Sequence, residues 1–141
     1  MSRNFLMENT MQISENNTPH YQRIGGDEKI RALVKRFYEL MDELPEAHRI
    51  RKMHHISLAG AEEKLFMFLS GWMGGPQRYV EKFGHPRLRQ RHLPFAIGDA
   101  ERDQWMMCMN QAMDEVIEDE AFRKELSAAF QKVADFMRNQ G

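Results

Sequence analysis

Apolar residues recur every three or four positions in four long stretches of the chain, which is the spacing of one face of an α-helix. The first stretch follows Gly25-Gly26 and ends near Leu44-Pro45, with Asp27 placed to cap its first turn. The second begins after Ser57, another candidate cap, and continues to about Gly74. No stretch alternates apolar and polar residues as a half-buried strand would. The pattern therefore predicts an all-α fold.

The second half of the chain predicts two further long helices. One carries Trp105 and continues to Ile117, and the other runs from Phe122 to Met137. Residues 1–19 are polar and close with a proline, so we expect a flexible N-terminal extension. The length of 141 residues then fits one domain, residues 20–141.

Composition narrows the classes of partner. Twenty Lys and Arg against 21 Asp and Glu give a net charge of -1, which provides no general attraction to nucleic acid or to an anionic membrane. No run reaches the roughly 20 apolar residues that span a bilayer. The single cysteine, Cys108, fits a reducing compartment, and the N-terminus has no apolar signal sequence. We therefore expect a cytoplasmic protein without a nucleic-acid or membrane partner.

The segment between the second and third long helices concentrates positive charge around a histidine. Residues 76–95 contain five Lys and Arg but one acid, Glu81. Pro94 cannot continue a helix, so His92 should lie at the end of a short one. Three interpretations fit this segment: a solvated basic surface, a patch that binds nucleic acid or an acidic partner, or the edge of a site for a ligand with carboxylates.

Most catalytic and metal sites are poorly supported. Cys108 lies on an apolar helix face, and no Gly-x-Ser-x-Gly turn or phosphate-binding loop occurs. The histidines at 54, 55, 85 and 92 are too scattered for the usual zinc spacings. A haem requires less: one axial histidine, an apolar slot and cations for its carboxylates. The sequence offers these around His92.

Four separated motifs resemble the group II truncated haemoglobins. They are Leu58-Ala59-Gly60-Ala61-Glu62-Glu63-Lys64-Leu65, Gly74-Gly75-Pro76, the run from Gly84 to Phe95, and Glu101-Arg102-Asp103-Gln104-Trp105. The resemblance covers about residues 21–138. It implies a truncated globin fold, in which a two-over-two helical sandwich surrounds haem b.

The same resemblance assigns roles to individual residues. His92 matches the proximal ligand of the haem iron, and Tyr38 and Trp105 match distal side chains that donate hydrogen bonds to an iron ligand. The family position that alternates between tyrosine and histidine corresponds to His54 rather than to its neighbour. Further distal positions are Ala61, where many globins have a histidine, and Leu65, one turn later. The remaining expected haem contacts are Phe37, Met53, Lys64, Phe68, Trp72, Tyr79, His85, Leu88, Arg91, Phe95, Ile97 and Met109, with Lys64 and Arg91 as partners of the haem propionates.

The resemblance implies reversible binding of dioxygen and other small diatomic ligands. The iron would be five-coordinate or ligated by Tyr38 or His54, and up to three distal donors should slow oxygen release. Slow release would suit redox chemistry on reactive oxygen or nitrogen species, with a reductase as partner, and the chain would be a monomer or weak homodimer. The alternative from another class is a haem-free helical module that binds nucleic acid or an acidic partner through residues 76–95.

Overall fold

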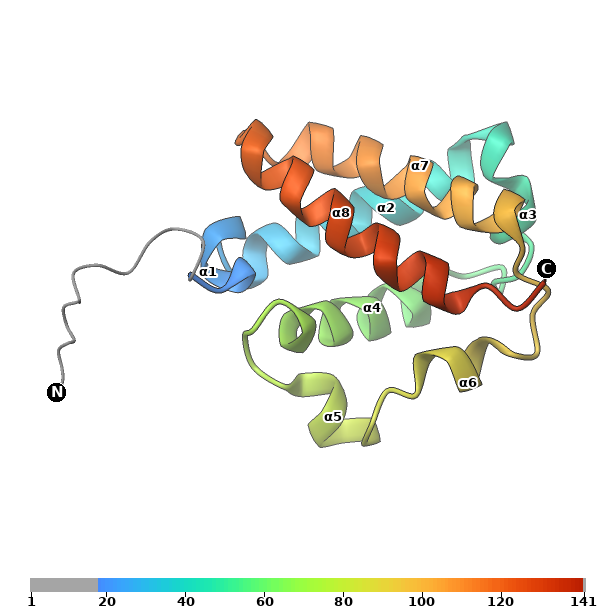
Figure 1. The fold of residues 1–141 in the computed structure, drawn as a ribbon, viewed down its shortest axis with the longest axis horizontal. Coiled ribbons are helices and arrows are strands. Elements are labelled where there is room, and N and C mark those ends of the chain that lie inside the picture. The colour runs from blue at the N-terminus through green and yellow to red at the C-terminus, as the bar shows by residue number, and fades with distance from the viewer. Residues whose placement is uncertain (1–17, 141) are drawn as a thin grey trace, which may run out of the picture.

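The structure, a computed structural model, describes residues 18–140 and is all-α over these residues (Figure 1). The expected N-terminal extension therefore lies outside the described residues, apart from residues 18 and 19. None of the described helices is long and apolar enough to cross a membrane. The helices are α1 (His20–Ile24), α2 (Asp27–Glu43), a 3-10 turn (Pro45–Ala47), α3 (His48–Arg51), α4 (Ala59–Trp72), α5 (Arg78–Phe83), α6 (Leu88–His92), α7 (Asp99–Val116) and α8 (Glu120–Met137).

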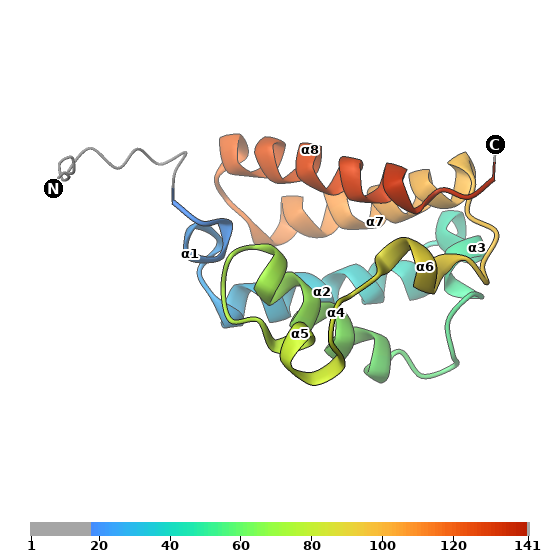
Figure 2. The same ribbon diagram turned by 60° about the horizontal axis from the view of Figure 1, so that its bottom comes forward.

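The four long helices form two antiparallel pairs. α2 runs against α4, α7 runs against α8, and α2 also packs closely on α7 (Figures 1 and 2). Fully buried side chains fill the contact between the pairs, among them Phe37 of α2, Met109 of α7 and Phe130 of α8. The prediction of an all-α, two-over-two arrangement is confirmed.

Two of the short helices, α5 and α6, lie on one side of this frame (Figure 1). α5 packs against α4, whereas α6 mainly contacts the end of α8 (Figure 2). α6 ends at His92, two residues before Pro94, as the proline predicts. None of the five residues of α6 is buried.

Both helix caps predicted from the sequence need correction. Gly26, not Asp27, occupies the cap position of α2, and the Asp27 carboxylate instead accepts hydrogen bonds from Arg78 at 2.8 and 2.7 Å and from Tyr21 at 2.7 Å. α4 begins at Ala59, two residues after Ser57, whose hydroxyl still accepts a bond from the Ala59 amide at 3.3 Å.

Candidate functional site

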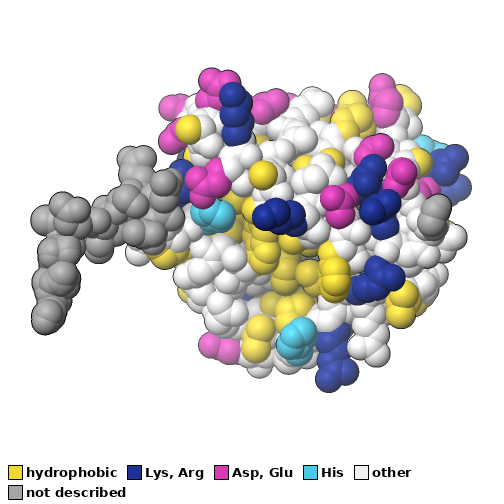
Figure 3. Space-filling model, viewed as in Figure 1, with side chains coloured by type: hydrophobic (Ala, Val, Ile, Leu, Met, Phe, Trp, Pro, Cys, Tyr) yellow, Lys and Arg dark blue, Asp and Glu magenta, His cyan; other side chains and the backbone are white. Residues whose placement is uncertain are grey.

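A largely apolar cavity opens between α6 and the long helices. Its empty volume, counted with its open mouth, is about 870 Å³. In Figure 3 hydrophobic side chains gather on this face, in the region where Figure 1 shows α4 between α8 and α6. The cavity is lined by Tyr38, Ile50, Met53, His54, Leu65, Phe68, Leu88, His92, Ile97, Glu101, Arg102, Trp105, Val133, Ala134 and Met137.

His92 presents one free ring nitrogen in this cavity. Its Nδ1 lies 2.6 Å from the carbonyl oxygen of Leu88, one turn earlier in α6. An oxygen acceptor at that distance requires Nδ1 to carry the proton, which leaves a lone pair on Nε2. Histidines that ligate metals in proteins usually have this arrangement, with the second ring nitrogen bonded to a carbonyl or carboxylate. His92 is therefore prepared to act as a metal ligand.

Two hydrogen-bond donors from other helices line the same cavity. Tyr38 of α2 is only 6% exposed, and no described residue accepts a hydrogen bond from its hydroxyl. Trp105 of α7 is half-buried between Phe37 and Phe130, at ring-centroid distances of 5.2 and 5.7 Å, and its indole N–H also lacks a partner among the described residues. Neither donor atom is fully enclosed, so both are open to an acceptor that enters the cavity.

His54 is a further polar group of the cavity lining, near Tyr38. The two rings meet edge to face, with centroids 5.7 Å apart, and Nδ1 of His54 lies 2.9 Å from the carbonyl oxygen of Ile50. Burial lowers the pKa of His54, and the nearby Arg51 lowers it further, so its ring favours the neutral form. Burial also raises the pKa of Tyr38, with a smaller contribution from Glu62, and keeps its hydroxyl protonated as a donor. His55, in contrast, is exposed and does not line the cavity.

The structure brings together about half of the residues that the sequence placed at the site. The cavity lining includes His92, the distal residues Tyr38, His54, Leu65 and Trp105, and the expected contacts Met53, Phe68, Leu88 and Ile97. The others do not line it. Phe37, Met109 and Tyr79 are buried in the core, Ala61 and Trp72 are half-buried and pack against the core, and Lys64, His85, Arg91 and Phe95 are exposed.

The exposed cations near the cavity rest on aromatic rings. Lys64 Nζ lies 5.7 Å from the ring centroid of Phe83, and the Arg91 guanidinium lies 5.8 Å from that of Tyr79. Neither cation forms an ion pair within the described residues, so both side chains are available to an anionic ligand. His85 is held outside the cavity, where its Nδ1 accepts a hydrogen bond from the Arg87 amide at 3.0 Å.

Six lining residues were not singled out from the sequence as site residues. Ile50, Val133, Ala134 and Met137 are apolar, and Glu101 and Arg102 belong to the polar first turn of α7. Glu101 accepts a hydrogen bond from the Gly98 amide at 2.8 Å, which holds the pKa of its carboxyl below the usual value. The apolar periodicity of α8 could have indicated that Val133, Ala134 and Met137 face the interior. Nothing in the local sequence placed Glu101 or Arg102 at a cavity.

The donor set fits a haem. The cavity offers one histidine nitrogen as an axial ligand, a predominantly apolar lining, unpartnered donors for an iron ligand, and exposed cations nearby for carboxylates. No group of three or more His, Cys, Asp or Glu that could hold a metal ion occurs in residues 18–140. Direct coordination of a bare metal ion is therefore not supported by the described side chains.

Comparison with known proteins agrees with this geometry. A family model described as bacterial-like globin matches residues 19–139. The group 2 truncated haemoglobin YjbI of Bacillus subtilis is 37% identical over 120 residues, which cover 85% of this chain and 88% of that protein.

Solved structures give the same result. A group II 2-on-2 haemoglobin from Agrobacterium tumefaciens is 49% identical with a TM-score of 0.85, covering 91% of this chain and 99% of that one. A structure described as a truncated oxygen-avid haemoglobin from Bacillus subtilis is 36% identical with a TM-score of 0.78, covering 86% and 100%. The chain therefore belongs to the bacterial-like globin family, in which it is a haem-binding group II truncated haemoglobin.

Proposed function

We propose that the protein holds haem b in this cavity through Nε2 of His92 and binds dioxygen reversibly. The observation that carries the proposal is one cavity shared by three groups: an imidazole whose Nε2 keeps its lone pair, and the hydroxyl of Tyr38 and indole N–H of Trp105, neither of which has an acceptor among residues 18–140. When bound, the haem supplies an iron centre that takes diatomic gases. The protein supplies the axial nitrogen, the apolar lining and the distal donors.

The distal residues would act by donating hydrogen bonds to the gas in the cavity. Tyr38 and Trp105 have no competing acceptor among the described residues, so neither must break a protein hydrogen bond to engage the ligand. Donors fixed in an apolar cavity stabilise developing negative charge more strongly than donors in water. Slow oxygen release follows, and the description of the Bacillus subtilis relative as oxygen-avid supports it.

The haem propionates would be held by cationic side chains at the protein surface. Lys64 and Arg91 are exposed and need only leave the aromatic rings on which they rest. Such exposed cation–aromatic contacts are worth only about 0.5–1 kcal/mol, so they hold the two side chains weakly. We therefore propose both side chains as propionate partners.

A reductase is the protein partner that we propose. Arg87, Arg89 and Arg91 form no ion pair with a described carboxylate, whereas every other described arginine does. With Arg91 assigned to a propionate, Arg87 and Arg89 remain; they flank the cavity residue Leu88, and their charge suits the acidic face of an electron-transfer protein. Such a partner would restore the ferrous form after chemistry on reactive oxygen or nitrogen species, which we propose to occur in the cytosol.

Oxygen binding is tested with the purified full-length protein. After reduction under argon, exposure to oxygen should change the visible spectrum, and renewed flushing with argon should restore the original spectrum. A protein purified colourless from haem-replete cells, and unable to take up added haemin, would contradict the proposal. It would favour the haem-free module, in which the unpaired arginines bind an acidic partner instead.

A further inference from the structure

The last described residues of the chain lie against the segment that follows His92. The backbone amides of Asn139 and Gln140 both donate to the carbonyl oxygen of Ile97, at 2.8 and 3.1 Å. The Asn139 side chain adds three more bonds. Its Oδ1 accepts from the Ile97 amide at 2.9 Å, and its Nδ2 donates to the carbonyl oxygens of His92 at 3.2 Å and Phe95 at 2.8 Å. We call residues 138–140 and these contacts the C-terminal clamp.

The chemistry of the clamp requires a carboxamide at position 139. The Asn139 side chain uses its one oxygen as an acceptor and both N–H bonds of its nitrogen as donors. An aspartate has nearly the same shape but no donor, and it would set a negative oxygen against two carbonyl oxygens. The contact is therefore specific to the amide.

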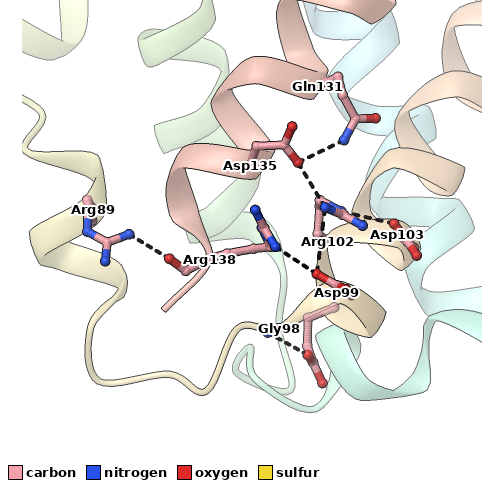
Figure 4. A network of polar contacts seen from close by, with 9 residues as sticks. Arg89, Gly98, Asp99, Arg102, Asp103, Gln131, Asp135 and Arg138 are labelled. Atoms are coloured by element: carbon pink, nitrogen blue, oxygen red, sulfur yellow. Dashed lines mark hydrogen bonds and ion pairs between the residues drawn. The ribbon is translucent and has the colours of Figure 1, made fainter. Parts of the chain in front are cut away.

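The clamp is itself anchored to the frame of long helices. Arg138 Nη1 lies 2.9 Å from Asp99 at the start of α7, and Arg102 lies 3.1 Å from Asp135 on α8 (Figure 4). Arg89 of α6 donates to the carbonyl oxygens of Phe136 and Arg138, at 3.0 and 2.5 Å. The last carbonyls of a helix lack partners within it and carry partial negative charge, so a guanidinium is well placed there.

α6 depends on such contacts because it has little packing of its own. It is five residues long, none of them is buried, and its main helical neighbour is the end of α8. A helix this short is unstable in isolation, and no buried apolar face fixes its position here. The hydrogen bonds of Arg89 and Asn139 replace that missing packing.

We propose that Asn139 is a positioning residue for His92, holding the carbonyl of that residue and the following turn so that Nε2 keeps one orientation towards the haem. This inference rests on the proposed function, because it assumes that His92 is the axial ligand. Asn139 touches the backbone of His92 and does not line the cavity. Its effect would therefore be indirect.

The test compares the full-length protein with Asn139→Ala, Asn139→Asp and, as a control, Lys132→Ala, which changes an exposed residue of the preceding helix α8. Three quantities are measured. They are amide hydrogen exchange at Ile97 in the apoprotein, the iron–histidine stretching band of the ferrous protein, and the rate of haem transfer to apomyoglobin. Asn139→Ala, which removes the acceptor, should speed Ile97 exchange at least about tenfold. Haem transfer should become about threefold to tenfold faster, and the band should shift or broaden, most in Asn139→Asp.

Two results would overturn the positioning role: unchanged Ile97 exchange, or faster exchange with the wild-type band and wild-type haem transfer. The second result would make Asn139 structural only. An iron–histidine band that survives His92→Ala would contradict the proposed function, and the positioning role with it. Ile97 exchange is measured without haem, so it shows separately whether the clamp forms.

Discussion

Removal of the Tyr38 hydroxyl by Tyr38→Phe separates the ligand-binding role of this residue from its role in the fold. The ring is 6% exposed and meets Phe37 edge to face at a centroid distance of 4.9 Å, contacts that phenylalanine retains. The hydroxyl bonds to no described residue, so its removal breaks no described hydrogen bond. We expect the free energy of unfolding of the ligand-free protein to change by less than about 0.5 kcal/mol.

Oxygen release should respond strongly to the same change. A hydrogen bond to a charged group contributes about 1.5–3 kcal/mol, and about 1.4 kcal/mol corresponds to a factor of ten. The dissociation rate should therefore rise by about 10- to 100-fold, because release no longer breaks this bond. Carbon monoxide accepts much less negative charge, so its release should change far less.

Stopped-flow measurement of oxygen displacement by carbon monoxide gives the rate. The matched control is Tyr79→Phe, since Tyr79 is also buried, at 9% exposure, but does not line the cavity. Oxygen release that is unchanged in Tyr38→Phe, or equally faster in Tyr79→Phe, would refute the reasoning about the distal donors.

Three further predictions concern the second donor, the Asp27 contact and the cysteine. Trp105→Phe should speed oxygen release by about tenfold in the same stopped-flow assay, because one donor is lost; an unchanged rate would assign the hydrogen bond to Tyr38 alone. Hydrogen bonds from Arg78, and secondarily from Tyr21, lower the pKa of Asp27 in the folded protein. The ionised carboxylate therefore stabilises the fold at pH values above its unfolded pKa of about 3.9, and this stabilisation is lost as the pH falls through the lowered, folded-state pKa. The free energy of unfolding, measured with urea, should therefore fall less steeply on acidification in Asp27→Asn than in the wild type. Identical pH profiles of the two proteins would contradict the contact. Burial raises the pKa of Cys108 to about 11, so iodoacetamide at pH 8 should label it only after unfolding, and rapid labelling of the native protein would show that the α7 core is open.

The sequence predicted the parts of the fold that depend on local pattern. The apolar stripes located α2, α4, α7 and α8, and Pro94 placed His92 at the end of a short helix. Local pattern could not determine contacts between distant residues. Asp27 was expected to cap α2 but bonds to Arg78, 51 residues later. Met109 was expected at the haem yet is fully buried, because periodicity identifies an apolar face without telling a core from a cavity.

The proximal segment shows the same limit. Asn139 looks like an ordinary polar residue at the end of the chain, and only the folded arrangement brings its amide to the carbonyl of His92, 47 residues earlier. Glu101 and Arg102 similarly reach the cavity because α7 begins at its edge. Their chemistry is visible in the sequence, but their location is not.

The central claim is that His92 holds haem in the cavity, and titration of the apoprotein with haemin tests it most directly. Wild-type protein and His85→Ala should bind one haem with the same Soret spectrum, because His85 is exposed and lies outside the cavity lining. His92→Ala should bind more weakly, with an altered spectrum that added imidazole restores. Unaltered affinity and spectrum in His92→Ala would contradict the account.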